Sequence, residues 1–334
     1  MENFLRRKQM KKCFIFIIYS FLSGYFLFLW VSTLWAQTYP NRPIQIIIPL
    51  DPGSAVDTMA RNFADELCKV LKIPIIAINK PGAASTLGTD FVVKSKKDGY
   101  TILYANTSAV VYSKASNPEQ VPYDPIKDLE PLGLHCFFPG CLVVYESLGL
   151  KTFSTFINFA KKNPGKLRIS TFGVGSIDHF NLEIIQSLTN AQFTMIPFKG
   201  AAAAITALLG GHVDATYTTI SLARPYVETG KIKILLIAKK IHEYPDVPTI
   251  TELGYKQNLL IPWFALFAPA GIPEEVKQVL IPAIETTVKN PELGAKIEKL
   301  GFIVDYKSAS ESRELMMSEY KIARELAIKL GLGK

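Results

Sequence analysis

Ser176 and His179 are the one pair in this sequence whose types and spacing suggest covalent chemistry. A serine hydroxyl activated by a nearby imidazole is the arrangement that nucleophilic hydrolysis requires. The surrounding Gly-Val-Gly-Ser stretch lacks the Gly-x-Ser-x-Gly elbow, and we find no acidic residue placed to orient the base. A hydrogen-bonding histidine on a helix face is therefore the favoured interpretation, and an exported hydrolase is the competing one.

Asp57 lies three residues after Ser54, and this spacing is the sequence form of a helix capping box. The apolar run 44–48 predicts a buried strand, Pro52-Gly53 predicts a turn, and the apolar periodicity of Val56–Leu71 predicts a helix. The N–H groups at the start of such a helix can bind a carboxylate or phosphate. Two interpretations stay open: a capped joint between strand and helix, or a ligand-binding turn.

The same succession of strand, polar loop and helix recurs along the chain. Strands predicted at 73–78 and 100–104 also end in small polar or Pro/Gly-rich loops. Strands joined through helices form a parallel sheet, and ligands bind outside the carboxyl ends of its strands. Further strands predicted at 167–170, 195–198 and 212–217 indicate a second α/β domain. We therefore expect a cleft between two domains, which is a preferred place for small-molecule sites.

The C-terminal part of the chain is expected to return to the first domain. The apolar segment Trp263–Gly271 is interpreted as the crossing, with hinge and core roles for its aromatic residues. After it, apolar periodicity predicts amphipathic helices at 274–288, 293–300 and 310–330.

The N-terminal 36 residues have the features of an export signal. Basic residues at positions 6–12 precede an uncharged apolar run from Cys13 to Ala36. The run is long enough to span a bilayer, so an uncleaved N-terminal anchor is the alternative to cleavage near Ala36. The formal net charge is +8 at pH 7, and about half of it lies in this leader. The remainder is a mild bias that does not indicate nucleic-acid binding.

Cysteine and histidine usage argues against a metal centre. The chain has four Cys and four His, without a CxxC or HExxH motif. Cys136 and Cys141 flank a Phe-Phe-Pro-Gly turn, and export permits a disulfide between them. Cys68 is expected to be a small core residue. We predict no metal and no cofactor.

Nine segments after the leader form a pattern that is specific in its order over residues 38–334, although no single segment is specific. They are Tyr39–Ile44, Pro52–Asp57, Asn79–Ala83, Asp98–Thr101, Pro122–Pro125, Phe198–Gly200, Leu208–Asp214, Pro245–Thr249 and Trp263–Pro273. In this order they resemble the Bug-type receptors, the extracytoplasmic receptors of tripartite tricarboxylate transporters.

The resemblance implies an α/β, two-lobed clamshell of the periplasmic binding protein type (type II), with the ligand cleft between the lobes. It divides the chain into a signal peptide or anchor at 1–36, a first lobe formed by 38–134 and 265–334, and a second lobe at 135–264. Family ligand residues, carried over by position, fall on Leu50, Asp51, Gly53, Ser54, Ala55, Ala83, Ser85, Thr86, Asn106, Thr107 and Ser108 in the first lobe, and on Phe172, Gly175, Ser176, His179, Thr218 and Thr219 in the second.

This sequence departs from the family pattern in its ligand loops. Asp51 stands where a proline is usual, Ser54 where a glycine is usual, and the loop Gly82–Ser85 carries fewer glycines than expected. Side chains at such positions narrow the approach of the backbone to an anion. We therefore expect a small carboxylate or a related ligand such as an amino acid or a neutral amide, with Asp51 as the residue that would favour an ammonium group.

The resemblance implies a periplasmic, non-enzymatic receptor that closes on its ligand by hinge motion and delivers it to integral membrane carrier subunits. We expect a monomer that does not bind nucleic acid. The alternative from another class is an input protein that presents its ligand to a signalling partner. Genes for membrane carrier subunits beside this one would favour transport, and a neighbouring sensor kinase would favour signalling.

Overall fold

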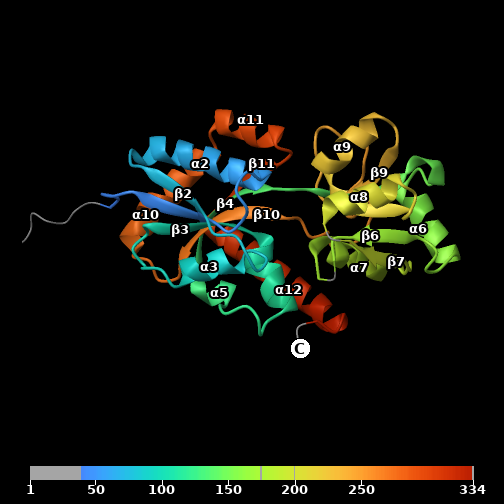
Figure 1. The fold of residues 1–334 in the computed structure, drawn as a ribbon, viewed down its shortest axis with the longest axis horizontal. Coiled ribbons are helices and arrows are strands. Elements are labelled where there is room, and N and C mark those ends of the chain that lie inside the picture. The colour runs from blue at the N-terminus through green and yellow to red at the C-terminus, as the bar shows by residue number, and fades with distance from the viewer. Residues whose placement is uncertain (1–38, 174, 199, 333–334) are drawn as a thin grey trace, which may run out of the picture. The chain divides into compact units, whose positions relative to one another are not determined.

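The computed structural model describes residues 39–332, apart from Val174 and Lys199. The predicted leader at 1–36 lies outside the described residues. No helix in the described part of the chain is long and apolar enough to cross a membrane. From residue 42 onwards the chain forms one compact unit that contains two mixed α/β lobes, each built around its own sheet (Figure 1).

The first lobe contains a six-stranded sheet in the order β11-β4-β10-β3-β1-β2. The three N-terminal strands are parallel, with Ile44 opposite Ile75 and Gln45 opposite Thr101, as the sequence predicts. The other three join antiparallel, beginning with β10 against β3. The strands are β1 (Ile44–Ile48), β2 (Ile75–Asn79), β3 (Thr101–Asn106), β4 (Leu129–Phe137), β10 (Trp263–Pro269) and β11 (Ile303–Lys307).

Helices cover both faces of this sheet because each has one apolar stripe to bury. One face carries α2 (Ala55–Leu71), α10 (Glu274–Val288) and α11 (Pro291–Lys299), and the other carries α3 (Thr86–Val93), α5 (Pro125–Asp128) and α12 (Ala309–Lys329) (Figure 1). The three predicted C-terminal helices are confirmed within two residues at each end. A π-helix, η1 (Ser108–Tyr112), and the short α4 (Ser113–Ser116) follow β3.

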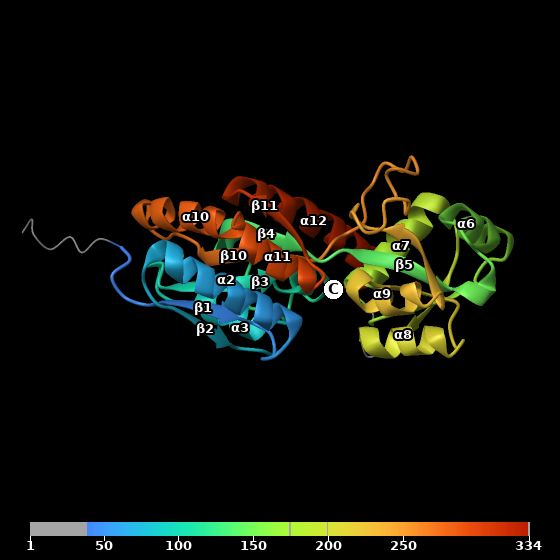
Figure 2. The ribbon, with the colours of Figure 1, turned by 90° about the horizontal axis from the view of Figure 1, so that it is seen from above.

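The second lobe contains a five-stranded sheet in the order β7-β6-β8-β5-β9. Strands β6, β7 and β8 are parallel, whereas β5 runs antiparallel to β8 and β9. The strands are β5 (Gly140–Tyr145), β6 (Arg168–Thr171), β7 (Thr194–Pro197), β8 (Ala215–Thr219) and β9 (Ile232–Ile237); the helices are η2 (Glu146–Leu148), α6 (Phe153–Lys162), α7 (Ile177–Thr189), α8 (Ala201–Leu209) and α9 (Ile220–Glu228), shown from above in Figure 2.

Two crossings connect the sheets, one at 138–139 and one at 238–262. They are joined by a hydrogen bond in which the Phe138 N–H donates to the Pro262 carbonyl at 2.7 Å. The boundaries placed after residues 134 and 264 fall inside β4 and β10, which pair within the first sheet as far as Phe137 and from Trp263 onwards. The division into lobes stays a proposal, and sheet pairing favours boundaries at the two crossings.

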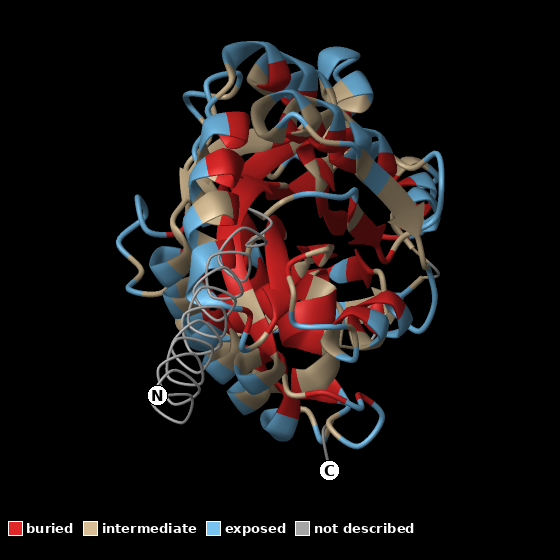
Figure 3. Ribbon diagram, turned by 90° about the vertical axis from the view of Figure 1, so that its left-hand side faces the viewer, coloured by how far each residue is buried: buried red, intermediate tan, exposed pale blue. Residues whose placement is uncertain are grey.

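Buried residues gather on the strands and on the inward faces of the helices (Figure 3). The predicted disulfide is not formed, because Cys136 and Cys141 are both free. Cys136 lies on β4 with its thiol 3.2 Å from the Met59 sulfur, whereas Cys141 lies on β5 and packs into the core of the second lobe. The two cysteines therefore belong to different sheets and different cores. Cys68 is also free and partly buried.

Candidate functional site

The first ligand loop lies between β1 and α2 and is organised by Asp57. Ser54 caps α2, and its hydroxyl accepts the Asp57 N–H at 3.1 Å. The Asp57 carboxylate in turn accepts the Gly53 N–H at 2.9 Å and the Asn79 side-chain amide at 2.8 Å. Arg61, one turn along the helix, completes an ion pair at 3.1 Å. Ser54 therefore caps α2 as predicted, whereas the Asp57 carboxylate accepts the N–H of Gly53, one residue before the N-cap that a capping box would use.

These contacts satisfy the charge of Asp57 within the lobe. Burial alone would raise the pKa of Asp57, but hydrogen bonds from Gly53, Asn79 and Arg61 outweigh it and lower that pKa below its ordinary value. Asn79 also donates to the Leu50 carbonyl at 3.1 Å, so one buried carboxylate ties together the loop, the helix and the end of β2. The contacts of Asp57 therefore fix the conformation of the first ligand loop.

The second ligand loop, between β2 and α3, has an unusual backbone. Ala83, Ala84 and Ser85 all adopt positive φ angles, of 46°, 50° and 74°. Residues with a Cβ atom rarely adopt this left-handed conformation, and glycine adopts it freely. The loop thus keeps a glycine-type course without the glycines. Its last turn buries Ser85 and Thr86, and the Thr86 hydroxyl donates to the Ala83 carbonyl at 2.7 Å.

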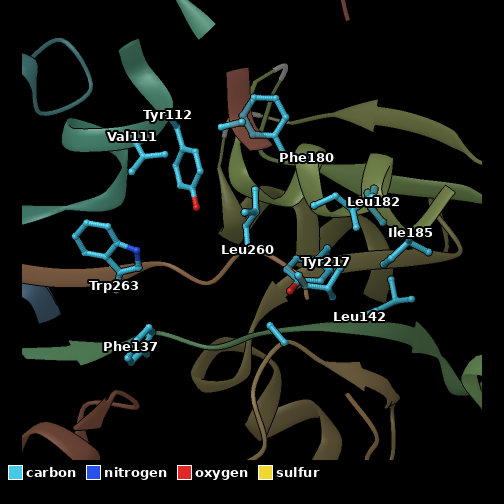
Figure 4. Packing of buried hydrophobic residues seen from close by; sticks show 14 of the residues in the cluster. Val111, Tyr112, Phe137, Leu142, Phe180, Leu182, Ile185, Tyr217, Leu260 and Trp263 are labelled. Atoms are coloured by element: carbon cyan, nitrogen blue, oxygen red, sulfur yellow. The ribbon is translucent and has the colours of Figure 1, made fainter. Parts of the chain in front are cut away.

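The third ligand loop leaves β3 and continues directly into the π-helix η1. Asn106 accepts the Ala109 N–H through its side chain at 3.1 Å, and Thr107 is buried. Single π-turns often occur at functional sites because they redirect a side chain. Here the π-turn ends at Tyr112, which points into the core between the lobes (Figure 4).

In the second lobe, Ser176 and His179 do not form a nucleophile and base pair. The Ser176 hydroxyl donates to the Gly173 carbonyl at 2.5 Å, and the His179 Nδ1 atom accepts the Gly175 N–H at 2.9 Å. Burial lowers the pKa of His179, which favours the neutral ring that this acceptor role requires. Both side chains therefore hold the loop in shape, and the hydrolase alternative loses its catalytic pair.

Asp178, between these two residues, is the most buried member of the loop. Only 1% of its surface is exposed, and its Oδ2 atom accepts the Phe172 N–H at 2.6 Å. Burial raises the pKa of Asp178 to about 6, although the Ser176 side chain and the N–H groups of Phe172, Asp178 and His179 oppose the shift. At the neighbouring end of β8, the Thr218 hydroxyl is buried without a hydrogen-bond partner among the described residues, and the Thr219 hydroxyl lies 3.3 Å from that of Ser221.

A buried polar cluster lies where the C-terminal helix meets the start of β10. The Glu319 carboxylate accepts the indole N–H of Trp263 at 2.9 Å and the Tyr112 hydroxyl at 3.3 Å. Figure 4 shows the hydroxyl and the indole nitrogen directed toward the same region. Burial raises the pKa of Glu319 to about 8, and the two hydrogen bonds oppose that shift. The carboxyl is therefore largely protonated at neutral pH.

Several contacts join the two lobes next to this cluster. The rings of Tyr112 and Phe180 lie 6.1 Å apart. The Asn181 amide, on α7, makes two hydrogen bonds with the backbone of Leu260, at 2.7 and 2.8 Å, and so holds the second crossing against the second lobe. Burial and several neighbouring groups, Tyr217 of β8 among them, raise the pKa of the Tyr112 phenol. Side chains from both lobes therefore share one buried environment.

The fold brings the predicted site residues to two sheet edges. Because β1, β2 and β3 are adjacent and parallel, the loops after them leave the same edge of the first sheet. The loops after β6 and β8 do the same in the second. Asp51, Gly53, Ala55 and Ala83 are exposed, and Leu50, Ser54, Asn106, Ser108, Phe172, Gly175, Ser176, His179 and Thr219 are half-buried. Contact of these residues with a ligand remains a proposal.

Sequence reasoning missed Asp178, Tyr112 and Glu319. The position of Asp178 in the first turn of α7 was a usable signal, because Asp57 occupies a similar position on α2. Glu319 and Tyr112 are 207 residues apart in the sequence, and nothing local connects them.

A separate cavity of about 470 Å³ is lined by residues of α9, of the crossing after β9 and of the α11–β11 turn, and by none of the predicted ligand residues. Among the described residues, no cluster of His, Cys, Asp or Glu could hold a metal ion.

Comparison with known proteins agrees with this architecture. The family model of the tripartite tricarboxylate transporter family receptors matches residues 59–332. Protein BugT from Bordetella pertussis is 33% identical over 285 residues, which cover 81% of this chain and 87% of BugT.

Two solved structures are similar over most of their length. A TctC solute-binding protein from Polaromonas, without ligand, superimposes with a TM-score of 0.80 at 28% identity and covers 87% of this chain and 100% of that one. MatC from Rhodopseudomonas palustris, with bound malate, gives a TM-score of 0.67 at 27% identity over 86% of this chain and 100% of MatC. The chain thus belongs to the tripartite tricarboxylate transporter receptor family and has the two-lobed fold of its solute-binding proteins.

Proposed function

We propose that this receptor captures a small carboxylate between its lobes and delivers it to integral membrane carrier subunits. The observation that carries the proposal is the position of five ligand loops at the carboxyl edges of two sheets whose lobes share a buried interface. Helices begin at these loops, and helix N-termini favour anions. The related MatC was solved with bound malate, which supports the same ligand class here.

The proposed mechanism is hinge closure around the two crossings. A ligand that contacts loops of both lobes binds the closed form better than the open form and shifts the population toward it. The hydrogen bond between Phe138 and Pro262 holds the crossings together, so they form a compact pivot. In this structure the loop after β6 already lies against α4, where a Cβ atom at Gly175 would lie 3.3 Å from the Ser116 hydroxyl.

The proposed role is non-enzymatic, periplasmic and monomeric. Ser176 and His179 are each committed to backbone atoms, so the described loop offers no activated nucleophile. The leader that supports export is a feature of the sequence.

A thermal-shift and calorimetry screen of residues 37–334 tests the function. Mono-, di- and tricarboxylates are added separately, because a ligand that binds only the folded state raises the midpoint of unfolding. We expect saturable binding of at least one carboxylate, together with a smaller radius of gyration in solution scattering. Binding of non-carboxylates alone, or turnover of a bound ester or amide, would contradict the proposal.

A further inference from the structure

Asp178 carries a buried carboxyl oxygen that has no hydrogen-bond partner among the described residues. Its Oδ2 atom accepts the Phe172 N–H at 2.6 Å, whereas its Oδ1 atom has no hydrogen-bond partner in the described part of the chain. The residue is only 1% exposed, so bulk water does not replace the missing partner. Buried acceptors are normally paired, and this one is therefore a candidate to accept a donor from a ligand.

Asp178 also lacks a counter-charge. Within the described residues it takes part in no ion pair, whereas Asp57, in the corresponding turn of the first lobe, is paired with Arg61 at 3.1 Å. Burial of an unpaired carboxyl favours its protonated form, and the raised pKa of Asp178 is consistent with this. A cation brought by the ligand would restore the charged form.

Two buried hydroxyl groups lie near Asp178 or near the loop that it holds. Burial and, next, the nearby Cys141 and Asp178 raise the pKa of the Tyr217 phenol, so Tyr217 and Asp178 lie close together. The Tyr217 hydroxyl is buried without a partner among the described residues, as is the Ser116 hydroxyl of the first lobe beside Gly175. Among the described residues, one unpaired oxygen on β8 thus lies near Asp178, and one on α4 lies against the loop that Asp178 holds.

Resting on the proposed carboxylate-receptor function, we propose that Asp178 binds the ammonium group of the ligand, so that this receptor selects amino acids over the same carboxylates without an amine. An ammonium group has three donors and one positive charge, which match a carboxylate and nearby hydroxyls. A plain dicarboxylate would instead place a second negative charge near Asp178 at low dielectric. This assigns the ammonium preference to Asp178 and not to the exposed Asp51.

The test is calorimetry of the full chain after its leader with matched ligand pairs. Aspartate and succinate differ only by the amine, as do glutamate and glutarate, and n-propylamine carries an amine without a carboxylate. The wild type is expected to bind the aminated member of a pair at least about tenfold more tightly. Asp178→Asn keeps an acceptor for the Phe172 N–H but removes the charge, and is expected to reduce this ratio to about one.

Two further variants make the result specific. Glu183→Gln removes one negative charge from the same helix, where Glu183 contacts Gln186, and is expected to leave the ratio unchanged. Asp51→Asn removes the charge that the sequence alone suggested. A ratio that falls in Asp51→Asn and persists in Asp178→Asn would overturn the assignment, and so would a fall of equal size in Glu183→Gln.

The outcomes separate this inference from the proposed function. Equal or tighter binding of succinate and glutarate by the wild type would overturn the role of Asp178 while the carboxylate receptor stands. Asp178-dependent binding of n-propylamine, with no binding of any carboxylate, would support the ammonium site and contradict the proposed function. Retention of the amine preference in a folded Asp178→Asn protein, shown by an unchanged thermal midpoint, would mean that Asp178 only shapes the loop.

Discussion

Each lobe places an acidic residue in the first turn of a helix that follows a ligand loop: Asp57 on α2 and Asp178 on α7. Both are buried and both accept a loop N–H. They differ in what surrounds the rest of the carboxyl group. Asp57 is paired with Arg61 and Asn79, whereas one oxygen of Asp178 has no hydrogen-bond partner in the described part of the chain. An acid at a similar position in a similar loop can therefore stabilise the loop in one lobe and leave a carboxyl oxygen for a ligand in the other.

Replacing Asp57 by asparagine should destabilise the protein far more than the same change at Asp178. Asp57→Asn removes the partner of Arg61 and presents an amide to the N–H donors of Gly53 and Asn79, so the free energy of unfolding should fall by about 3 kcal/mol. Asp178→Asn keeps an acceptor for the Phe172 N–H and removes a buried charge that has no ion-pair partner among the described residues, so its change should stay within about 1 kcal/mol. Urea denaturation at pH 7 measures both, and equal losses would contradict the comparison.

The pH dependence of folding stability below neutrality should also distinguish Asp57 from Asp178. Because the pKa of Asp57 is lowered in the folded state, its stabilisation is present above the ordinary pKa and is lost as the pH falls through the folded value. The pKa of Asp178 shifts in the opposite direction. Because it is raised in the folded state, stability falls as the pH rises from about 4 to about 6.

Glu319 extends the comparison to a third buried acid. Its pKa is raised to about 8, so the folded state holds a proton that the unfolded state releases near its ordinary pKa. Stability should therefore fall as the pH rises between these values, by about 2 kcal/mol over 1.5 pH units. Glu319→Gln should flatten this slope, measured as the difference in urea midpoint between about pH 5.5 and pH 7. A slope that the substitution leaves unchanged would assign the titration elsewhere.

Gly88 tests how rigidly the first lobe holds its loops. A Cβ atom at Gly88 would lie 2.6 Å from the Lys80 carbonyl and 2.9 Å from the Pro49 Cβ, which are parts of the first two loops. Gly88→Ala should therefore lower the free energy of unfolding by about 2 kcal/mol. Gly294→Ala is the matched control, because that helical position is open and alanine should raise stability by up to about 1 kcal/mol. Similar effects in the two variants would mean that these loops shift freely.

The smallest effect concerns the left-handed loop of the first lobe. Ala84→Gly removes a Cβ from a residue with φ of 50°, and should stabilise the fold by about 1 kcal/mol or less. Thermal unfolding of this variant beside Ala201→Gly, in the first turn of a regular helix, gives the control, since glycine should destabilise there. A destabilised Ala84→Gly variant would contradict the observed backbone.

Local sequence signals predicted the elements whose causes are local. The strand at Ile44–Ile48 and the N-cap at Ser54 both form as predicted, because periodicity and capping act within a few residues. The strand β4 escaped prediction because Pro131 and Gly133 interrupt its pattern, and β11 escaped because its five residues are all half-buried. Their pairing depends on strands far away in the sequence.

The sequence predicted the position of the site loops but not the charge state of their acids. The loops after parallel strands could be placed at one sheet edge from strand order alone. The charge state of an acid in such a loop depends on partners such as Arg61 and Asn79 for Asp57, or on their absence for Asp178, which only the folded chain determines. The sequence therefore drew attention to the exposed Asp51, whereas Asp178 is the buried acid of the ligand loops that has no ion-pair partner among the described residues.

The most direct test of this account is a residue-resolved ¹³C NMR titration of the side-chain carboxyl groups of Asp57 and Asp178 in the full chain after its leader. The two substitutions to asparagine assign the resonances. We predict a titration midpoint below the ordinary aspartate value for Asp57 and one near 6 for Asp178, with the second moving downward when an amine-bearing ligand binds. Midpoints that coincide, or an Asp178 midpoint that no ligand moves, would contradict the division of roles between the lobes.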